Sequence, residues 1–259
     1  MKPRVLLVGG VDPSGGAGLS VDAAVTVACG AAPLPVPIAL TVQSRRGFRE
    51  LMPVPESSWR GAIEAQFADA PVHAVKVGLV GDVGNVLALA ATLRRLAAGV
   101  PIIVDPVLGA TAGGLQGSDE LLAAYRSQLV PLATLLTPNA PELAALFGGD
   151  VDAALASGAG AVLHKGGHRE GAQSVDELHD ADGMRAFARE RLAIGPVRGT
   201  GCALASAIAA LLARGFGLDE AVRHAGDRLA AVLASMGPPA ADGLPRLLPL
   251  ARWPVADVD

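Results

Sequence analysis

Short runs of apolar residues alternate with segments of helical periodicity along nearly the whole chain. The apolar runs predict buried strands at 4–10, 36–42, 74–80, 101–107, 134–138 and 160–167. The segments between them predict helices at 18–30, 56–69, 83–98, 118–129 and 139–147, and two consecutive helices between 201 and 236. Continuous apolar strands separated by helices are typical of a mostly parallel sheet with helices on both faces. We therefore expect one α/β domain spanning residues 1–259.

Glycines and polar residues gather where these strands end. They lie in the segments 9–18, 41–47, 77–82, 105–114, 137–142 and 164–168. The carboxyl ends of parallel strands meet at one edge of a sheet, and ligands bind beyond that edge. The pattern predicts a large polar site there and leaves its ligand open.

Composition and charge narrow the class of protein. Hydrophobic residues make up 51% of the 259, which is enough for a sizeable core. The mean hydropathy is +0.42, but the long apolar run 202–213 is closed by Arg214 and is shorter than the roughly 20 residues of a membrane span. The net charge of −4 comes without a basic block, which argues against a nucleic-acid partner. We expect a soluble, cytoplasmic protein.

Lysine is rare, and its positions are informative. Among 21 basic residues the lysines are Lys2, Lys76 and Lys165. The last two follow strand-like runs in "VKVG" and "HKGG", where a compact ammonium suits a phosphate. Chance explains Lys76 about equally well, whereas Lys165 is the stronger candidate.

The glycine-rich segment 9–22, "GGVDPSGGAGLSVD", matches neither common nucleotide motif. Gly16 and Ala17 stand where a phosphate loop requires Lys and Ser or Thr, and the dinucleotide fingerprint is incomplete. A glycine-rich turn that opens a helix remains, and it can bring backbone N–H groups close to a small ligand. Asp22 lies one turn inside that helix and would, by itself, be interpreted as a solvated carboxylate.

Further candidates follow the other strands. Gln43 ends a strand, and its amide offers donors and an acceptor that suit an aminated heteroaromatic ring. Asp105 and Glu142 place carboxylates at two more strand ends. The pair Asn139 and Glu142 fits a Mg²⁺ site held through water and a helix capping box equally well.

The segment 198–202, "RGTGC", predicts an anion site. The small residues Gly199, Thr200 and Gly201 precede a long apolar helix, so its first N–H groups are free for a planar or tetrahedral anion. A thiol at that position, Cys202, is expected to have a lowered pKa, although simple packing also explains it. Cys29, in the first helix, is expected to be packed in the core.

These motifs occur in a recognisable order. The segments "DPSGGAGLSVD", "ALTVQSRRG", "AVKVGLVGD", "DPVL", "TPNAPELAALFG", "LHKGGH" and "GTGCALASAIAALLARG" cover nearly the whole chain. In this order they resemble the ribokinase-like superfamily and, within it, the hydroxymethylpyrimidine/phosphomethylpyrimidine kinases of thiamine biosynthesis. The combination of "DPSGGAG" with "GTGC" is specific, because most of the superfamily ends the second motif in Asp.

The resemblance implies a three-layer fold and an ATP- and Mg²⁺-dependent kinase. It would phosphorylate 4-amino-5-hydroxymethyl-2-methylpyrimidine and then its monophosphate, and the family suggests a homodimer. The implied roles are as follows: Gly199, Thr200, Gly201 and Cys202 form the anion hole and catalytic position; Gln43, Asp22, Gly10, Leu79 and Val107 bind the ring; Lys165, Asn139 and Asp105 serve the nucleotide phosphates; and Glu142 serves the metal.

The chain also departs from the family pattern. "GATAGG" at 109–114 replaces a family segment that contains a lysine, Arg198 replaces a family histidine, and Leu79 replaces a methionine. Arg198 offers a positive charge in place of the missing lysine. A pyridoxal kinase, a non-catalytic sensor of pyrimidines or nucleotides, and a carbohydrate kinase are the alternatives, and the last lacks its Asp.

Overall fold

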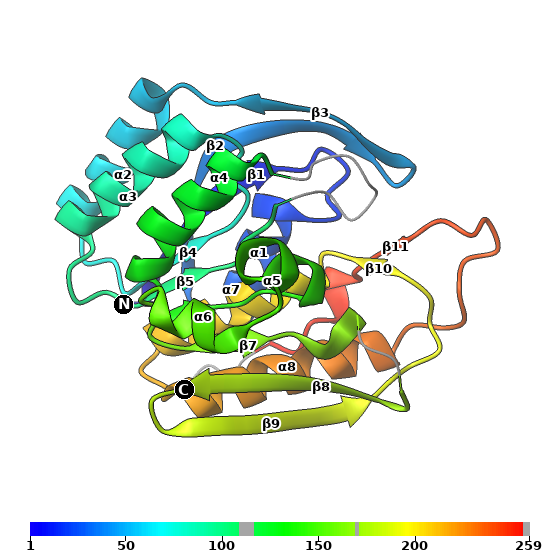
Figure 1. Cartoon of the computed structure of the whole chain (residues 1–259). Coiled ribbons are helices and arrows are strands. Elements are labelled where there is room, and N and C mark those ends of the chain that lie inside the picture. The colour runs from blue at the N-terminus through cyan, green and yellow to red at the C-terminus, as the bar shows by residue number, and fades with distance from the viewer. Residues whose placement is uncertain (109–116, 169–170, 256–259) are drawn as a thin grey trace.

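The computed structural model describes residues 1–108, 117–168 and 171–255, and its centre is a nine-stranded sheet. The strand order is β3-β2-β1-β4-β5-β6-β7-β8-β9 (Figure 1). The six parallel strands are β1 (Arg4–Val11), β2 (Ala32–Ser44), β4 (Ala74–Val77), β5 (Ile102–Val104), β6 (Leu135–Leu136) and β7 (Val162–His164). Three antiparallel strands extend the two edges: β3 (Gly47–Pro53), β8 (Gln173–Asp180) and β9 (Gly183–Glu190).

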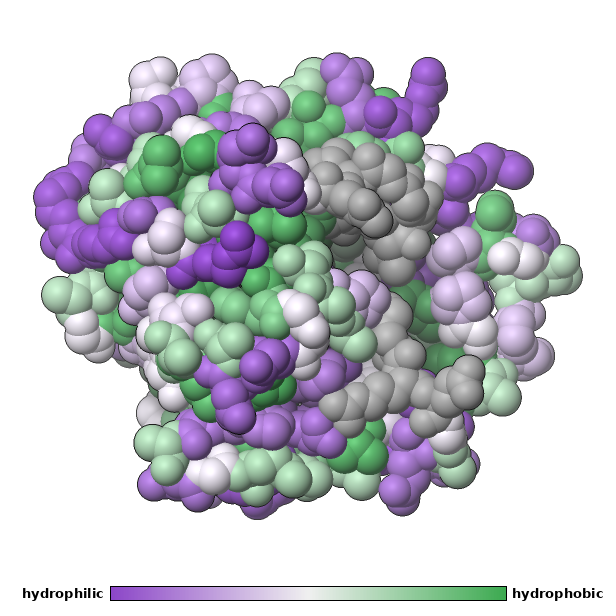
Figure 2. All heavy atoms as spheres, in the orientation of Figure 1, coloured by the Kyte–Doolittle hydropathy of each residue, from purple (hydrophilic) through white to green (hydrophobic). Residues whose placement is uncertain are grey.

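Helices cover both faces of this sheet. One face carries α1 (Gly18–Ala28), α7 (Thr200–Ala213) and α8 (Leu218–Ala234). The other carries α2 (Glu56–Asp69), α3 (Val83–Leu96), α4 (Asp119–Ala124), α5 (Ala140–Phe147) and α6 (Val151–Ala156). Hydrophilic side chains, with some hydrophobic ones among them, lie on the side of the molecule where Figure 1 draws α2 and α3 (Figure 2).

Alternation along β1 explains how two cores form. Val5 and Leu7 are fully buried against the α1, α7 and α8 side, whereas Leu6 and Val8 are fully buried against the α2 and α3 side. Successive side chains of a strand point to opposite faces, so an apolar run buried on both faces needs helices on each side. The expected three-layer α/β fold is confirmed.

The strands that the sequence pattern missed are the polar ones at the edges. In β9 exposed and half-buried residues alternate, and β8 contains a single buried residue, Leu178. Such strands have one solvated face and lack the continuous apolar run that marks the centre of the sheet. β2 also begins earlier than expected, at Ala32. Pro33, Pro35 and Pro37 have no N–H group, but as alternate residues they face the same edge of the strand, so the other edge can still pair. β3 pairs with β2 only from Ala39 onward.

Two short strands form a second sheet. β10 (Val197–Arg198) pairs with β11 (Arg246–Leu247) and leads directly into α7. Within the described ranges, no helix is both long enough and apolar enough to cross a membrane.

Candidate active site

A cavity of about 1160 Å³ lies at the carboxyl ends of the parallel strands. Every residue that the sequence assigned to the site lines this cavity: Gly10, Asp22, Gln43, Leu79, Asp105, Val107, Asn139, Glu142, Lys165, Gly199, Thr200, Gly201 and Cys202. The segment 109–114, which lacks the family lysine, lies outside the described residues.

The start of α7 presents free backbone donors to the cavity. Gly199 caps the helix with φ of 84°, and a Cβ at this position would lie 2.4 Å from the carbonyl oxygen of Gly16. Only glycine combines that φ with that close approach. Within the described chain, the amides of Thr200, Gly201 and Cys202 have no hydrogen-bond acceptor, and the first helical bond runs from Ala203 to Gly199. Free amides at a helix N-terminus form an anion site.

Lys165 places a positive charge beside these amides. Its Nζ lies 2.8 Å from Asp105 Oδ1 and 3.7 Å from Glu142 Oε2, and a Cβ on Gly201 would lie 3.3 Å from the same nitrogen. Burial alone would lower the pKa of Lys165, but the carboxylates of Asp105 and Glu142 raise it above its ordinary value. Lys165 therefore stays positively charged. It directly follows β7, and this places its ammonium at the start of α7.

Asp105 is the buried partner of that cation. Burial alone would raise the pKa of Asp105, but Lys165 and Lys76 hold it below its ordinary value. The hydroxyl of Thr137 donates to the same oxygen at 3.2 Å. Asp105 thus stays ionised, and its carboxylate fixes the position of the Lys165 ammonium.

Asn139 and Glu142 form the capping box that one interpretation of the sequence predicts. Asn139 Oδ1 accepts from the Glu142 amide at 2.9 Å, and Glu142 Oε2 accepts from the Asn139 amide at 2.8 Å. Burial raises the pKa of Glu142 in spite of the opposing charge of Lys165. The capping box occupies Oε2 of this cavity-lining residue, so Oε1 is left without a hydrogen bond from the described residues.

The expected lowering of the Cys202 pKa is wrong. Burial raises the pKa of this thiol to about 11, and the opposing charge of Lys76 does not compensate. Asp22 and Asp105 raise it further, and the backbone of Gly18 lowers it without reversing the shift. The helix N-terminus favours a thiolate, but Cys202 is half-buried in the cavity wall, and desolvation of the charged form is the larger effect there.

Asp22 and Lys76 form a buried ion pair beneath this helix. Asp22 Oδ2 lies 2.8 Å from Lys76 Nζ, and Asp22 Oδ1 accepts from the Ser206 hydroxyl at 2.8 Å. Asp22 is 0% exposed and Lys76 1% exposed, so the interpretation of Asp22 as a solvated carboxylate is wrong. The pair joins α1, β4 and α7, which fixes the helix start relative to the sheet. Cys29 is fully buried, as expected.

The opposite part of the cavity is suited to a flat ring. Leu79 packs on the glycine backbone of β1, since a Cβ on Gly10 would lie 3.0 Å from Leu79 Cδ2. Val107 adds a second apolar side chain, and Gln43, one residue before the end of β2, also lines the cavity.

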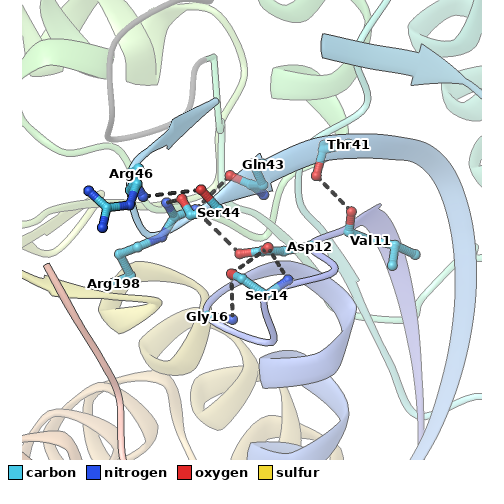
Figure 3. A network of polar contacts seen from close by, with 9 residues as sticks. All are labelled: Val11, Asp12, Ser14, Gly16, Thr41, Gln43, Ser44, Arg46 and Arg198. Carbon is cyan, nitrogen blue, oxygen red and sulfur yellow. Dashed lines mark hydrogen bonds and ion pairs between the residues drawn. The ribbon is translucent and has the colours of Figure 1, made fainter. Parts of the chain in front are cut away.

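Arg198 is a residue whose place the sequence did not predict. Its guanidinium donates to Asp12 Oδ2 at 3.3 Å, to Gln43 Oε1 at 2.6 Å and to the Ser44 carbonyl at 2.9 Å (Figure 3). Arg198 is 4% exposed, and Asp12 balances its charge. Whether its charge also compensates for the missing lysine stays a prediction, because Arg198 lines the cavity as well as pairing with Asp12. In the sequence, the one feature that points to Arg198 as a site residue is its position directly before "GTGC".

The β8–β9 hairpin contributes a second set of residues that sequence reasoning missed. Arg189 and Asp176 line the cavity, and their side chains lie 3.5 Å apart. Arg189 also covers α8, because a Cβ on Gly226 would lie 2.3 Å from its Cζ. The pattern did not predict either strand of this hairpin, so it gave no reason to place Arg189 in the site.

Three comparisons with known proteins agree with this geometry. A family model described as phosphomethylpyrimidine kinase matches residues 12–239. The hydroxymethylpyrimidine/phosphomethylpyrimidine kinase of Mycobacterium tuberculosis is 39% identical over 231 residues, which cover 85% of this chain and 84% of the relative.

Solved structures show the same fold. The crystal structure of phosphomethylpyrimidine kinase from Clostridium difficile has a TM-score of 0.74 and 31% identity, covering 86% of this chain and 96% of the other. An ADP complex of Bacillus subtilis pyridoxal kinase has a TM-score of 0.84 at 24% identity, covering 97% and 99%. At that identity the second likeness concerns the fold alone.

Proposed function

Because the chain belongs to the phosphomethylpyrimidine kinase family, we propose that it phosphorylates the hydroxymethyl group of 4-amino-5-hydroxymethyl-2-methylpyrimidine with ATP, and then phosphorylates the monophosphate, in thiamine diphosphate biosynthesis. One observation carries the proposal. The free amides of Thr200, Gly201 and Cys202 and the ammonium of Lys165 lie in the same cavity as the Gln43 amide. The cavity therefore offers donors both for a phosphoryl group and for a heteroaromatic ring.

In the transfer, a bond forms between the hydroxymethyl oxygen and the γ-phosphorus, and the bond from that phosphorus to the β–γ bridging oxygen breaks. Negative charge spreads over the transferred oxygens and the leaving ADP. The amides of α7 and the Lys165 ammonium are donors fixed before the reaction, and such donors stabilise developing charge most effectively. Lys165 is held in place by Asp105, so it needs no reorganisation during the step.

Cys202 positions the substrate hydroxyl in this proposal. With a pKa of about 11 its thiol is neutral near pH 7, so it is a poor general base. A primary alcohol that loses its proton late in a loose transition state does not need a strong base. The S–H group orients the hydroxyl oxygen, and the proton passes to an oxygen of the transferred phosphoryl group.

The donor set fits Mg²⁺ held mainly by the nucleotide and water. In the described ranges no group of three or more His, Cys, Asp or Glu side chains could form a cage for a metal ion. Mg²⁺ usually keeps several waters and uses one or two carboxylates together with substrate phosphates. Glu142 would hold it, because its Oε1 is left over by the capping box. When bound, the ion neutralises charge on the phosphates.

A coupled assay of ADP release tests the proposal. It compares three separate substrates: the free pyrimidine, its monophosphate and pyridoxal. We expect the free pyrimidine to give the highest kcat/KM. Faster turnover of pyridoxal would favour a pyridoxal kinase, and tight binding of pyrimidine and ATP without ADP release would favour a sensor.

The monophosphate is the informative second substrate. The family lysine is absent from 109–114, so we expect a higher KM for the monophosphate than for the free pyrimidine. Sedimentation velocity tests the homodimer that the family suggests.

A further inference from the structure

The buried guanidinium of Arg198 contacts the amide of Gln43, the residue that the proposed function assigns to the substrate ring. We propose that Arg198 is a positioning residue that sets which face of the Gln43 amide meets the substrate, so that the cavity presents an N–H donor to an unprotonated ring nitrogen. This inference rests on the proposed function and names the ring edge that the site recognises.

The hydrogen-bond chemistry decides the orientation of the amide. A guanidinium has five N–H donors and no acceptor, so the Gln43 atom 2.6 Å from Arg198 Nη2 must be the carbonyl oxygen. An amide turned by 180° would set two donors against each other. The Nε2 group is left without a hydrogen bond from the described residues, on a side chain that lines the cavity.

The guanidinium is itself held in one position. Nη1 donates to the Ser44 carbonyl at 2.9 Å, and Nη2 donates to Asp12 Oδ2 at 3.3 Å as well as to Gln43. Asp12 is fixed in turn, because its Oδ1 accepts from the Ser14 amide at 2.9 Å and from the Ser14 hydroxyl at 2.7 Å. Figure 3 shows Arg198 meeting Gln43 and Ser44 on one side and Asp12 on the other. A guanidinium that is hydrogen-bonded to three oxygens cannot turn together with the Gln43 amide, so it holds that amide in one orientation.

Arg198 also connects the ring pocket to the anion site. It directly precedes Gly199, whose left-handed turn packs against the Gly16 carbonyl. The side chain reaches Gln43 at the end of β2. Arg198 therefore holds the donor that binds the ring in a fixed position relative to the start of α7. This also fixes the ring relative to the transferred phosphoryl group.

Lysine is the natural test residue, because it keeps the charge opposite Asp12 but has no planar fork. In Arg198→Lys we expect the KM for the free pyrimidine to rise about tenfold, the size of one lost hydrogen bond, while the KM for ATP changes less than twofold. The preference for the pyrimidine over its deaza analogue, with C–H in place of the ring nitrogen, should also fall about tenfold.

A double-mutant cycle separates positioning from a general structural role. If Arg198 acts through Gln43, then Arg198→Lys should change the KM for the pyrimidine less than twofold in a Gln43→Ala background. Equal effects in both backgrounds would overturn the inference while leaving the proposed function intact. If wild-type protein neither binds nor phosphorylates the pyrimidine, the proposed function fails and the inference fails with it.

Gln43→Glu is the second variant, should Arg198→Lys not fold. A carboxylate keeps an acceptor for Arg198 but has no donor for the ring. We expect a KM for the pyrimidine at least tenfold higher, with an unchanged KM for ATP and an unchanged thermal midpoint. Wild-type binding of the pyrimidine by Gln43→Glu would show that no donor is needed, and would overturn the inference.

Discussion

The thiol of Cys202 has a pKa of about 11, because burial raises it more than the neighbouring Lys76 lowers it. At pH 9 only about 1% of such a thiol is ionised. We therefore expect a kcat profile without a thiol ionisation between pH 6 and 9. Cys202→Ser should keep turnover within about tenfold, because a hydroxyl also orients the substrate, whereas Cys202→Ala should lose about 100-fold.

The profile is measured with saturating ATP and pyrimidine. A rising limb with an apparent pKa near 7 in the wild type, absent from Cys202→Ser, would show that the sulfur acts as a base. Such a result would also mean that bound substrates lower the pKa of the thiol by several units.

Lys165 is expected to contribute to both turnover and stability, and a paired substitution separates the two. Lys165→Met should lower kcat by about 100- to 1000-fold, the usual effect of removing one charge-stabilising donor. It also leaves Asp105, 1% exposed, as a buried charge without its cation, which destabilises a protein by about 3–5 kcal/mol.

The control is the double variant Lys165→Met with Asp105→Asn. It should recover most of the thermal stability and none of the turnover. Recovery of turnover with stability would indicate that Lys165 serves the fold alone.

At the scale of single elements, Glu142 at the start of α5 has a structural role in the capping box and a proposed role in holding Mg²⁺, and substitutions can separate the two. Glu142 accepts the Asn139 amide through Oε2, and a glutamine can do the same through its amide oxygen. We expect Glu142→Gln to stay within about 0.5 kcal/mol of the wild-type free energy of unfolding. Its loss of charge should raise the Mg²⁺ concentration needed for half-maximal activity about tenfold.

Asn139→Ala is the matched variant, because it removes the cap on the Glu142 amide. It should lower the free energy of unfolding by about 1 kcal/mol, measured by urea denaturation, and leave the Mg²⁺ requirement near that of the wild type. An unchanged Mg²⁺ requirement in Glu142→Gln would restrict Glu142 to the capping box.

Among the strands, the sequence predicts most clearly those that are buried on both faces of the sheet. β1, β4 and β7 have apolar runs that cannot be solvated, and the small residues before α7 identify its start. The β8–β9 hairpin was not predicted, because a strand with one wet face resembles a polar loop in a single sequence.

The same distinction applies inside the site. Residue types and spacing located Gln43, Lys165 and the amides of 199–202, because their chemistry is local to a strand end or helix start. The pKa of Cys202 and the pairing of Arg198 with Gln43 depend on what lies around them in three dimensions. Sequence separation of 155 residues between Arg198 and Gln43 gives no local signal of their contact.

At the scale of the whole molecule, the cavity is lined by residues of both sheet edges and of helices from both layers, from Gly9 to Leu233. Local opening of any of these elements would remove part of the site, so ligand binding and global stability are linked. We expect ADP with Mg²⁺ at 100 times its dissociation constant to stabilise the fold by about 2.7 kcal/mol. For a chain of this size that corresponds to a rise of about 5–10 °C in the thermal midpoint.

Scanning calorimetry measures this shift, with Mg²⁺ alone as the control. The free pyrimidine should add a further rise on top of ADP, because the residues proposed to bind it, Gln43, Leu79 and Val107, lie outside the start of α7 that forms the anion site. In Lys165→Met with Asp105→Asn the ADP shift should shrink while the pyrimidine shift persists, since only the phosphates contact the missing ammonium. Equal loss of both shifts would mean that the two halves of the cavity do not form independently, and that Lys165 organises the whole of it.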